Sequence, residues 1–286
     1  MYSETYLGFL IVFLLPPIAA LVALARLRPA ARAGRIPLIG LGIILVLAMT
    51  YTTPWDNLLI EQGVWWYGDG VTLVHFWAAP LGEYLFFVLQ PVLTALFLYQ
   101  LSIPTHGDLR LPRRTRLVGI AAGLAVTGVG VTLLLAGPST LYLGAILAWA
   151  GPILAIQWGF GWTHLVRARR PVVLAIVIPT LYLWVLDWYA ITVAGLWTIS
   201  PTYTVGIAPF GLPIEEMLFF LVTNVFVVQG LVLWLWLVAQ WPDVADDVRQ
   251  RLPDRIVSLA PRWMFDAGGD ADRSGAGTRR RDDTGQ

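Results

Sequence analysis

The sequence contains no cysteine and no lysine, so all 19 of its basic residues are arginine. The absence of cysteine excludes disulfides, iron–sulfur clusters and thiol catalysis. The absence of lysine excludes a retinal Schiff base, because that linkage forms on a lysine amine. The three histidines are scattered without the spacing of metal ligands, so the sequence predicts no metal site.

Charge of either sign is also scarce. Charged residues make up 13% of the chain, against about 25% in a typical soluble domain. Hydrophobic residues reach 57%, and the mean hydropathy is +0.69. Seven apolar segments approach the roughly 20 residues that a bilayer requires, which predicts an all-α, polytopic membrane protein. The predicted spans are 6–25, 37–53, 80–101, 117–136, 141–160, 171–190 and 213–240.

The arginines alternate between the two ends of the predicted bundle. They follow the first, third, fifth and seventh spans, and the intervening loops have none. Because cytoplasmic loops are rich in basic residues, this pattern predicts a cell-membrane protein with its N-terminus outside and its C-terminus in the cytoplasm. Residues 242–286 offer too little apolar surface for a core, which predicts a disordered cytoplasmic tail.

One motif occurs twice in the chain. Pro80–Phe87 reads PLGEYLFF, and Pro213–Phe220 reads PIEEMLFF, 133 residues later. A proline suits the first turn of a helix, so each copy predicts a helix start with an acid in its first turn.

Further matches extend the repeat. Asp56 and Asp187 lie 131 residues apart, and a tryptophan follows each aspartate by ten residues. Tyr6 matches Tyr142 in the same way. We therefore expect two parallel three-helix repeats, at 1–101 and 141–241, joined by a linking region with one helix at 102–140.

The acids near the membrane are the first candidates for function. Charged side chains beside hydrocarbon mark functional sites, although a single acid at a helix N-terminus can simply cap the helix. Recurrence at matched positions favours the functional interpretation. The candidate acids are Glu216, Glu83, Glu215, Asp56 and Asp187.

Aromatic rings accompany these acids and could face a cation. The candidate rings are Trp66, Trp197, Phe86, Phe87, Phe219 and Phe220. Asn224, which lies within the last span, could form hydrogen bonds between helices. Acids among rings could hold a cation, carry protons, or protonate an apolar substrate.

These motifs resemble a known family. PWDN followed by GVWWY and PLGEYLFF, then LDWYAITVAGLW followed by LPIEEMLFF, is similar to the membrane-integral, flavin-independent lycopene cyclases. The resemblance implies cyclisation of the linear ends of lycopene to β-rings, through γ-carotene to β-carotene. It also implies Glu216 or Glu83 as the acid, with Asp56, Asp187 or Glu215 as its partner or base. One position departs from the pattern, since Gly82 stands where the fuller motif has a first glutamate.

The resemblance implies an isomerisation without net redox change, so no cofactor is expected. The short Gly-x-Gly stretches lie in membrane segments and predict no dinucleotide fold, and a dependence on reduced nucleotide or flavin stays open. The expected partners are lycopene, entering from the bilayer, and the lipid itself, with no nucleic acid; the oligomeric state stays open. The alternatives are a carotenoid cyclase of another ring type, a proton- or cation-coupled transporter, and a carotenoid-binding protein without catalysis.

Overall fold

The computed structural model describes residues 5–27 and 35–241. Within this part of the chain, seven helical segments are long and apolar enough to cross a membrane, which confirms the all-α, polytopic prediction. The predicted tail at 242–286 lies outside the described residues. The seven segments are Tyr6–Leu27, Arg35–Glu61, Leu81–Leu98, Arg113–Ala136, Pro138–Arg167, Arg169–Thr192 and Ile214–Ala239.

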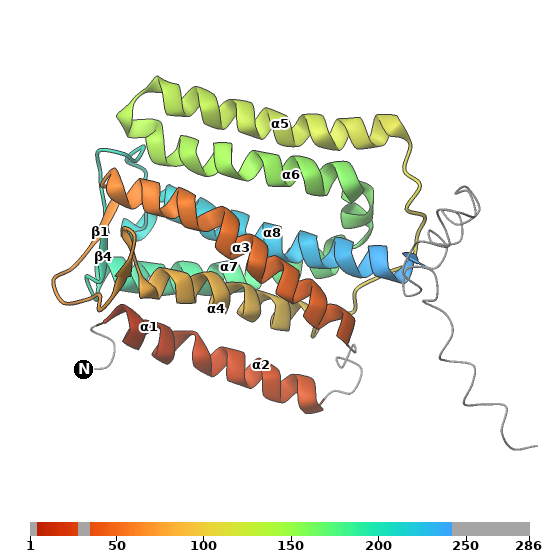
Figure 1. The fold of residues 1–286 in the computed structure, drawn as a ribbon, viewed down its shortest axis with the longest axis horizontal. Helices are drawn as coiled ribbons and strands as arrows, with labels where there is room; N and C mark the ends of the chain where they lie inside the picture. The colour runs from red at the N-terminus through yellow and green to blue at the C-terminus, as the bar shows by residue number, and fades with distance from the viewer. Residues whose placement is uncertain (1–4, 28–34, 242–286) are drawn as a thin grey trace, which may run out of the picture.

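The helices run side by side along roughly one direction, and the short strands lie at one end of them (Figure 1). The helices are α1 (Tyr6–Phe13), α2 (Leu15–Leu27), α3 (Arg35–Glu61), α4 (Leu81–Leu98), α5 (Arg113–Ala136), α6 (Leu141–Arg167), α7 (Arg169–Thr192) and α8 (Ile214–Ala239). Short 3₁₀ turns at Pro138–Thr140 and Pro209–Gly211 precede α6 and α8. The strands are β1 (Trp65–Tyr67), β2 (His75–Phe76), β3 (Ala79–Pro80) and β4 (Trp197–Ile199).

The first span consists of two helices because prolines interrupt it. Pro17 has no N–H to donate to the carbonyl of Phe13, four residues earlier. The phenol of Tyr182 donates to that carbonyl instead, at 2.6 Å. The interruption thus creates an acceptor by which α7 binds the first span. Tyr51 makes the same kind of bond from α3 to the carbonyl of Trp149 in α6, at 2.8 Å.

Two local predictions need correction. The second predicted span ends at residue 53, but helix α3 continues to Glu61. Asp56 therefore lies inside α3 and not in the following loop. The hydropathy falls there because the last turns of α3 face a polar interior: Asn57 is fully buried and accepts bonds from the backbone of Ala78 and Ala79. Pro80 and Pro213 have extended backbone and precede their helices, rather than occupying the first turn.

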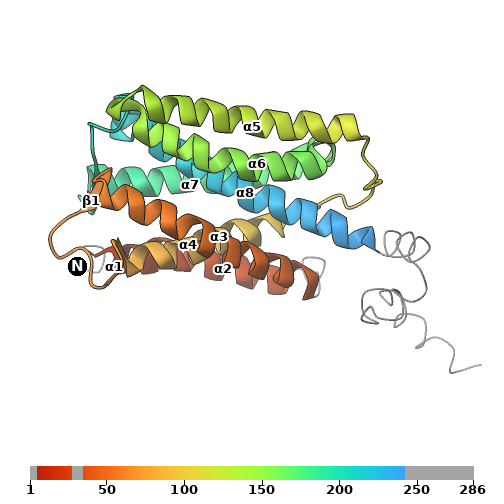
Figure 2. The ribbon, with the colours of Figure 1, turned by 45° about the horizontal axis from the view of Figure 1, so that its top comes forward.

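Helices α4 and α8 lie at the centre of the bundle. They pack on each other, and each also packs on α3 and α7. The paired helices α1–α2 lie along one edge and α5 along the opposite edge (Figures 1 and 2). The two helices that carry the repeated motif therefore meet in the interior.

The linking helix α5 packs closely on α6 through small residues. A Cβ at Gly123 would collide with the backbone of Ala155, and one at Gly151 would collide with Thr127. Close approach of glycine-lined helices is a common way to associate helices in lipid. This contact fixes α5 beside α6, away from the centre.

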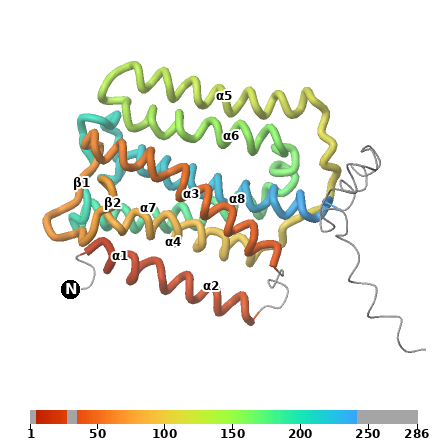
Figure 3. The backbone as a smooth tube through the Cα atoms, viewed as in Figure 1, coloured from red at the N-terminus to blue at the C-terminus, as the bar shows by residue number. Residues whose placement is uncertain are grey.

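A small ribbon, which the sequence did not predict, covers one end of the bundle. Strand β1 pairs antiparallel with β4, and Trp66 lies opposite Thr198. A second short ribbon joins β2 to β3. The tube drawing shows β1 and β2 at the same end as the start of α1 (Figure 3). The beginnings of α4 and α8 and the ends of α3 and α7 all meet at this end.

Candidate active site

Four carboxylates from four helices line one cavity of about 60 Å³. Glu83 and Glu216 come from the first turns of α4 and α8. Asp56 and Asp187 come from near the ends of α3 and α7. The two aspartates and Glu216 are buried, with 2–6% of their surface exposed. No arginine or histidine is among the described residues that line the cavity, so none of these residues supplies a positive charge to the acids.

Each glutamate accepts a hydrogen bond from a tyrosine. The phenol of Tyr67 donates to Oε1 of Glu83 at 2.5 Å, and the phenol of Tyr142 donates to Oε1 of Glu216 at 2.7 Å. The indole of Trp65 in turn donates to the Tyr67 oxygen at 3.1 Å. Burial, and then the charge of Glu83, raise the pKa of the Tyr67 phenol well above its ordinary value. Tyr67 therefore stays protonated and acts as a donor.

The aspartates are less completely satisfied. The indole of Trp197 donates to Oδ1 of Asp187 at 3.0 Å. Within the described part of the chain, Oδ2 of Asp56 and Oδ2 of Asp187 are buried and have no hydrogen-bond partner. Unsatisfied buried oxygens are uncommon and cost free energy. Two of them in one cavity indicate a place for a proton or for a cationic group.

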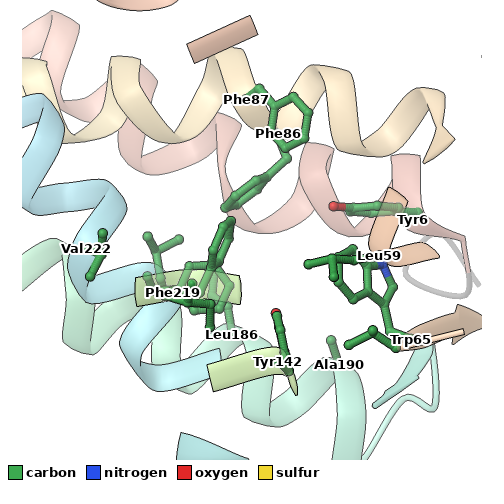
Figure 4. Packing of buried hydrophobic residues seen from close by; sticks show 14 of the residues in the cluster. Tyr6, Leu59, Trp65, Phe86, Phe87, Tyr142, Leu186, Ala190, Phe219 and Val222 are labelled. Carbon is green, nitrogen blue, oxygen red and sulfur yellow. The ribbon is translucent and has the colours of Figure 1, made fainter. Parts of the chain in front are cut away.

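Aromatic rings form most of the remaining wall. Figure 4 shows the phenol oxygens of Tyr6 and Tyr142 directed into the same interior space, with Phe86 and Phe219 beside it. Tyr6 packs on Trp197 at a centroid distance of 5.1 Å. The faces of such rings attract positive charge, so the cavity combines carboxylates with surfaces that suit a carbocation.

The structure brings most of the predicted residues to this cavity. The predicted residues in its lining are Asp56, Glu83, Phe86, Asp187, Trp197, Glu216, Phe219 and Phe220. Four others are absent from the lining: Trp66, Phe87, Glu215 and Asn224.

Glu215 and Asn224 have structural surroundings instead. Glu215 is fully buried, and its Oε1 accepts from the backbone N–H of Val205 at 2.8 Å, which holds the loop before α8. Its Oε2 has no partner among the described residues, but Glu215 does not line the cavity. Asn224 accepts from Thr94 at 2.5 Å and donates to Thr180 at 2.9 Å. It therefore joins α4, α7 and α8 within the bundle, as its polarity suggested.

Trp66 points away from the cavity and is 49% exposed. Successive side chains of a strand face opposite sides. Because Trp65 and Tyr67 face the interior, Trp66 between them faces outward. Phe87 lies on α4 one position beyond Phe86 and lines a neighbouring apolar cavity.

Several residues at the site were not candidates from the sequence. These are Tyr6, Trp55, Tyr67 and Tyr142. The match between Tyr6 and Tyr142 across the repeat was a usable signal, because matched polar rings near matched acids favour one site. Tyr67 gave no such signal, since its counterpart in the second repeat is Thr198.

Gly82 is explained by its neighbour. A Cβ at this position would collide with the ring of Tyr6. The first motif therefore has no room for a side chain at the position that Glu215 occupies in the second. The space beside Glu83 is filled by an aromatic ring rather than by a second acid.

Comparison with known proteins gives one consistent result. Lycopene beta-cyclases from two strains of Halobacterium salinarum are 48% identical to this chain over 240 residues, covering 84% of this chain and 99% of the relatives. A bifunctional lycopene cyclase/phytoene synthase of Gibberella fujikuroi is 33% identical over 237 residues, covering 81% of this chain and 39% of the fungal protein. No family model and no solved structure matches the chain. The chain belongs to the lycopene beta-cyclase family.

Proposed function

We propose that this protein is a lycopene β-cyclase that closes the linear ends of lycopene into β-rings, through γ-carotene to β-carotene. The observation that carries this function is one aromatic cavity that gathers four carboxylates and has no cationic side chain among the described residues of its lining. The 48% identity to the haloarchaeal lycopene beta-cyclases supports it independently.

The reaction requires one proton donor and one proton acceptor. A carboxylic acid protonates the terminal double bond of the substrate and leaves a tertiary carbocation. The next double bond attacks this cation, which forms the six-membered ring and moves the charge onto a ring carbon. A carboxylate then removes a ring proton. One proton enters and one leaves, so the step is an isomerisation without redox change.

The cavity supplies both roles. Carboxyl groups that share one enclosed space share protons, so the set can contain an acid and a base together. We assign the acid and its partner to Glu216 and Glu83, each held by a tyrosine. We assign stabilisation of the carbocation to Asp56 and Asp187, whose Oδ2 atoms have no described partner. The ring faces of Tyr6, Trp197 and Phe220 add to this stabilisation.

We also infer that the two halves of the chain, 1–101 and 141–241, are structural repeats that pair with each other at the β1–β4 ribbon. Matched contacts support this symmetry. The bond from Tyr51 to Trp149 corresponds to the bond from Tyr182 to Phe13. The ribbon pairs Trp66 with Thr198 and Tyr67 with Trp197, which is the pairing that exchange of the repeats would reproduce.

The position of the arginines supports an orientation with the site at the outer face of the cell membrane. The loops at the ribbon end, 62–80, 137–140 and 193–213, contain no arginine, whereas α5 begins with Arg113 at the opposite end. Because the natural chain has no cysteine, one introduced by Asp69→Cys would be the only thiol. We expect a membrane-impermeant thiol reagent to label it in intact cells; labelling only after lysis would reverse the orientation.

The test of function is expression in a bacterium that accumulates lycopene, followed by chromatography of the pigments. We expect a β-carotene peak that is lost in Glu216→Gln and retained in Asp69→Asn, a control acid that is exposed outside the cavity. A bicyclic product with other ring ends would show a cyclase of different ring type. Unchanged lycopene, with the protein present in the membrane, would contradict the proposal and favour transport or pigment binding.

A further inference from the structure

A second cavity, of about 270 Å³, adjoins the acid cavity. Helices α3, α4, α6 and α8 form its walls. Phe86 and Phe219 line both cavities. These two phenylalanines occupy equivalent positions of the two motif copies. The second cavity therefore meets the acid cavity where the repeated motifs meet.

The lining of this second cavity suits a hydrocarbon. No carboxylate, arginine or histidine is among the described residues around it. Several of its polar side chains are already engaged with the backbone: Tyr51 donates to the carbonyl of Trp149, and Thr223 donates to the carbonyl of Phe220. The amide nitrogen of Gln157 donates to a backbone carbonyl, whereas its Oε1 and the Nε1 of Trp149 are buried in this lining without a partner among the described residues.

The cavity also reaches the lipid-facing surface of the bundle. Leu47 lines it and is 55% exposed. The aromatic contacts that join α3 to α6 come from Tyr51 and Trp55 against Trp149, nearer to the ribbon end. The cavity extends past them along α3, where Ala48 and Ile44 form part of its wall. An apolar chain in the bilayer could thus enter beside α3.

We infer that the second cavity holds the stretch of polyene that follows the reacting end of the carotenoid. Phe86 and Phe219 then form the passage between the second cavity and the acid cavity. The inference rests on the proposed cyclase function and adds a binding site for the chain. The two cavities, of about 60 Å³ and 270 Å³, together reach only the lower end of the roughly 300–1,000 Å³ of pockets that enclose a drug-sized ligand, and a C40 carotenoid is longer than such a ligand. The remainder of a C40 chain therefore lies in the lipid.

This arrangement has a consequence for the order of the reaction. With one end in the acid cavity and the other end in the bilayer, only one end reacts per binding event. The singly cyclised product must leave and return in the opposite direction before its second end reacts. γ-Carotene is therefore released between the two cyclisations.

The first test measures binding without turnover. The double variant Glu83→Gln with Glu216→Gln, purified from lycopene-accumulating cells, is the parent. Adding Ala48→Trp fills the cavity, and we expect it to lower the retained lycopene per protein about tenfold. Adding Ile178→Trp, at the equivalent of Leu47 and exposed on α7, is the matched control and leaves retention unchanged. Equal retention in the Ala48→Trp protein would overturn the inference.

The second test compares substrates of different length in the otherwise natural protein. We expect Ala48→Trp to lower turnover of lycopene about tenfold. It should change turnover of a truncated acyclic polyene with the same end group less than about twofold, because a short chain does not fill the second cavity. An equal loss on both substrates would mean a general structural defect and would overturn the inference. Failure of the natural protein to cyclise lycopene, with retention still dependent on Ala48, would contradict the cyclase function alone.

Discussion

The two repeats place equivalent acids at the site, but these acids accept hydrogen bonds from different donors. In the first repeat a phenol, Tyr67, donates to the glutamate Glu83. In the second repeat an indole, Trp197, donates to the aspartate Asp187. The counterpart of Tyr67 is the exposed Thr198, and the counterpart of Trp197 is the exposed Trp66. Each half of the site thus has a donor that the other half lacks.

The geometry of the ribbon explains this difference. Trp66 and Trp197 match in sequence, but β1 and β4 pair Tyr67 with Trp197. Paired residues of an antiparallel ribbon face the same side, and neighbours along a strand face opposite sides. Trp66 must therefore face outward when Trp197 faces inward. A symmetric pairing of two strands has produced an asymmetric site, which suits a reaction that needs an acid and a base.

The largest expected effect comes from replacing the glutamate of one half of the site at a time. If both halves form one composite site, Glu216→Gln and Glu83→Gln should each lower lycopene turnover by about 10²- to 10⁴-fold, the usual contribution of general acid–base catalysis. The measurement is pigment conversion per unit of membrane protein. Two independent half-sites would instead leave about half of the turnover in each single variant.

The second prediction concerns the smallest residue of the first motif. Gly82→Ala should lower the stability of the detergent-solubilised protein by about 1–3 kcal/mol, because the new Cβ displaces the Tyr6 ring. The melting temperature measures this effect. Gly42→Ala on α3 is the matched control, because no atom lies within 4 Å of its Cβ. Partial recovery in the double variant with Tyr6→Leu would identify the ring as the cause; no loss in Gly82→Ala would contradict it.

The sequence predicted the seven spans because hydropathy and length alone decide whether a helix can cross lipid. It also predicted the four acids of the cavity, since each has a partner at a matched position. It missed the extent of α3 for a physical reason. The hydropathy falls at Asp56 and Asn57 because these side chains face a polar interior, and a single sequence cannot distinguish that from a loop.

Trp66 lies outside the cavity although its equivalent, Trp197, lines it, so matching the repeats does not predict the position of every residue. Matching the two repeats in sequence predicts that equivalent residues lie at equivalent places. That prediction is sound for helices, because both copies of a helix have the same orientation in the bundle. It does not hold where the two copies pair with each other, because strand alternation depends on a register that no single sequence reveals. Tyr67 was missed because its inward direction also depends on this register. In the sequence alone it looks like any aromatic residue of a loop.

The third prediction tests the donor that only the first half has. Tyr67→Phe removes a hydrogen bond to a carboxylate and should lower turnover about tenfold. Because burial and Glu83 raise the pKa of Tyr67, the phenol stays protonated below pH about 10. An alkaline limb below that value therefore does not come from the phenol itself, and Tyr67→Phe should not abolish such a limb. Disappearance of an alkaline limb in the variant would show that the phenol titrates during the reaction.

The smallest expected effect distinguishes the two matched tryptophans directly. Trp197→Phe removes the 3.0 Å bond to Asp187, whose other oxygen has no described partner. Loss of a bond to a buried acceptor costs about 1–3 kcal/mol, so we expect turnover to fall roughly fivefold or more. Trp66→Phe keeps a ring on the outer face of the ribbon and should change turnover by less than about twofold. Equal losses in the two variants would mean that Trp66 also reaches the acids, and the explanation from strand alternation would then be wrong.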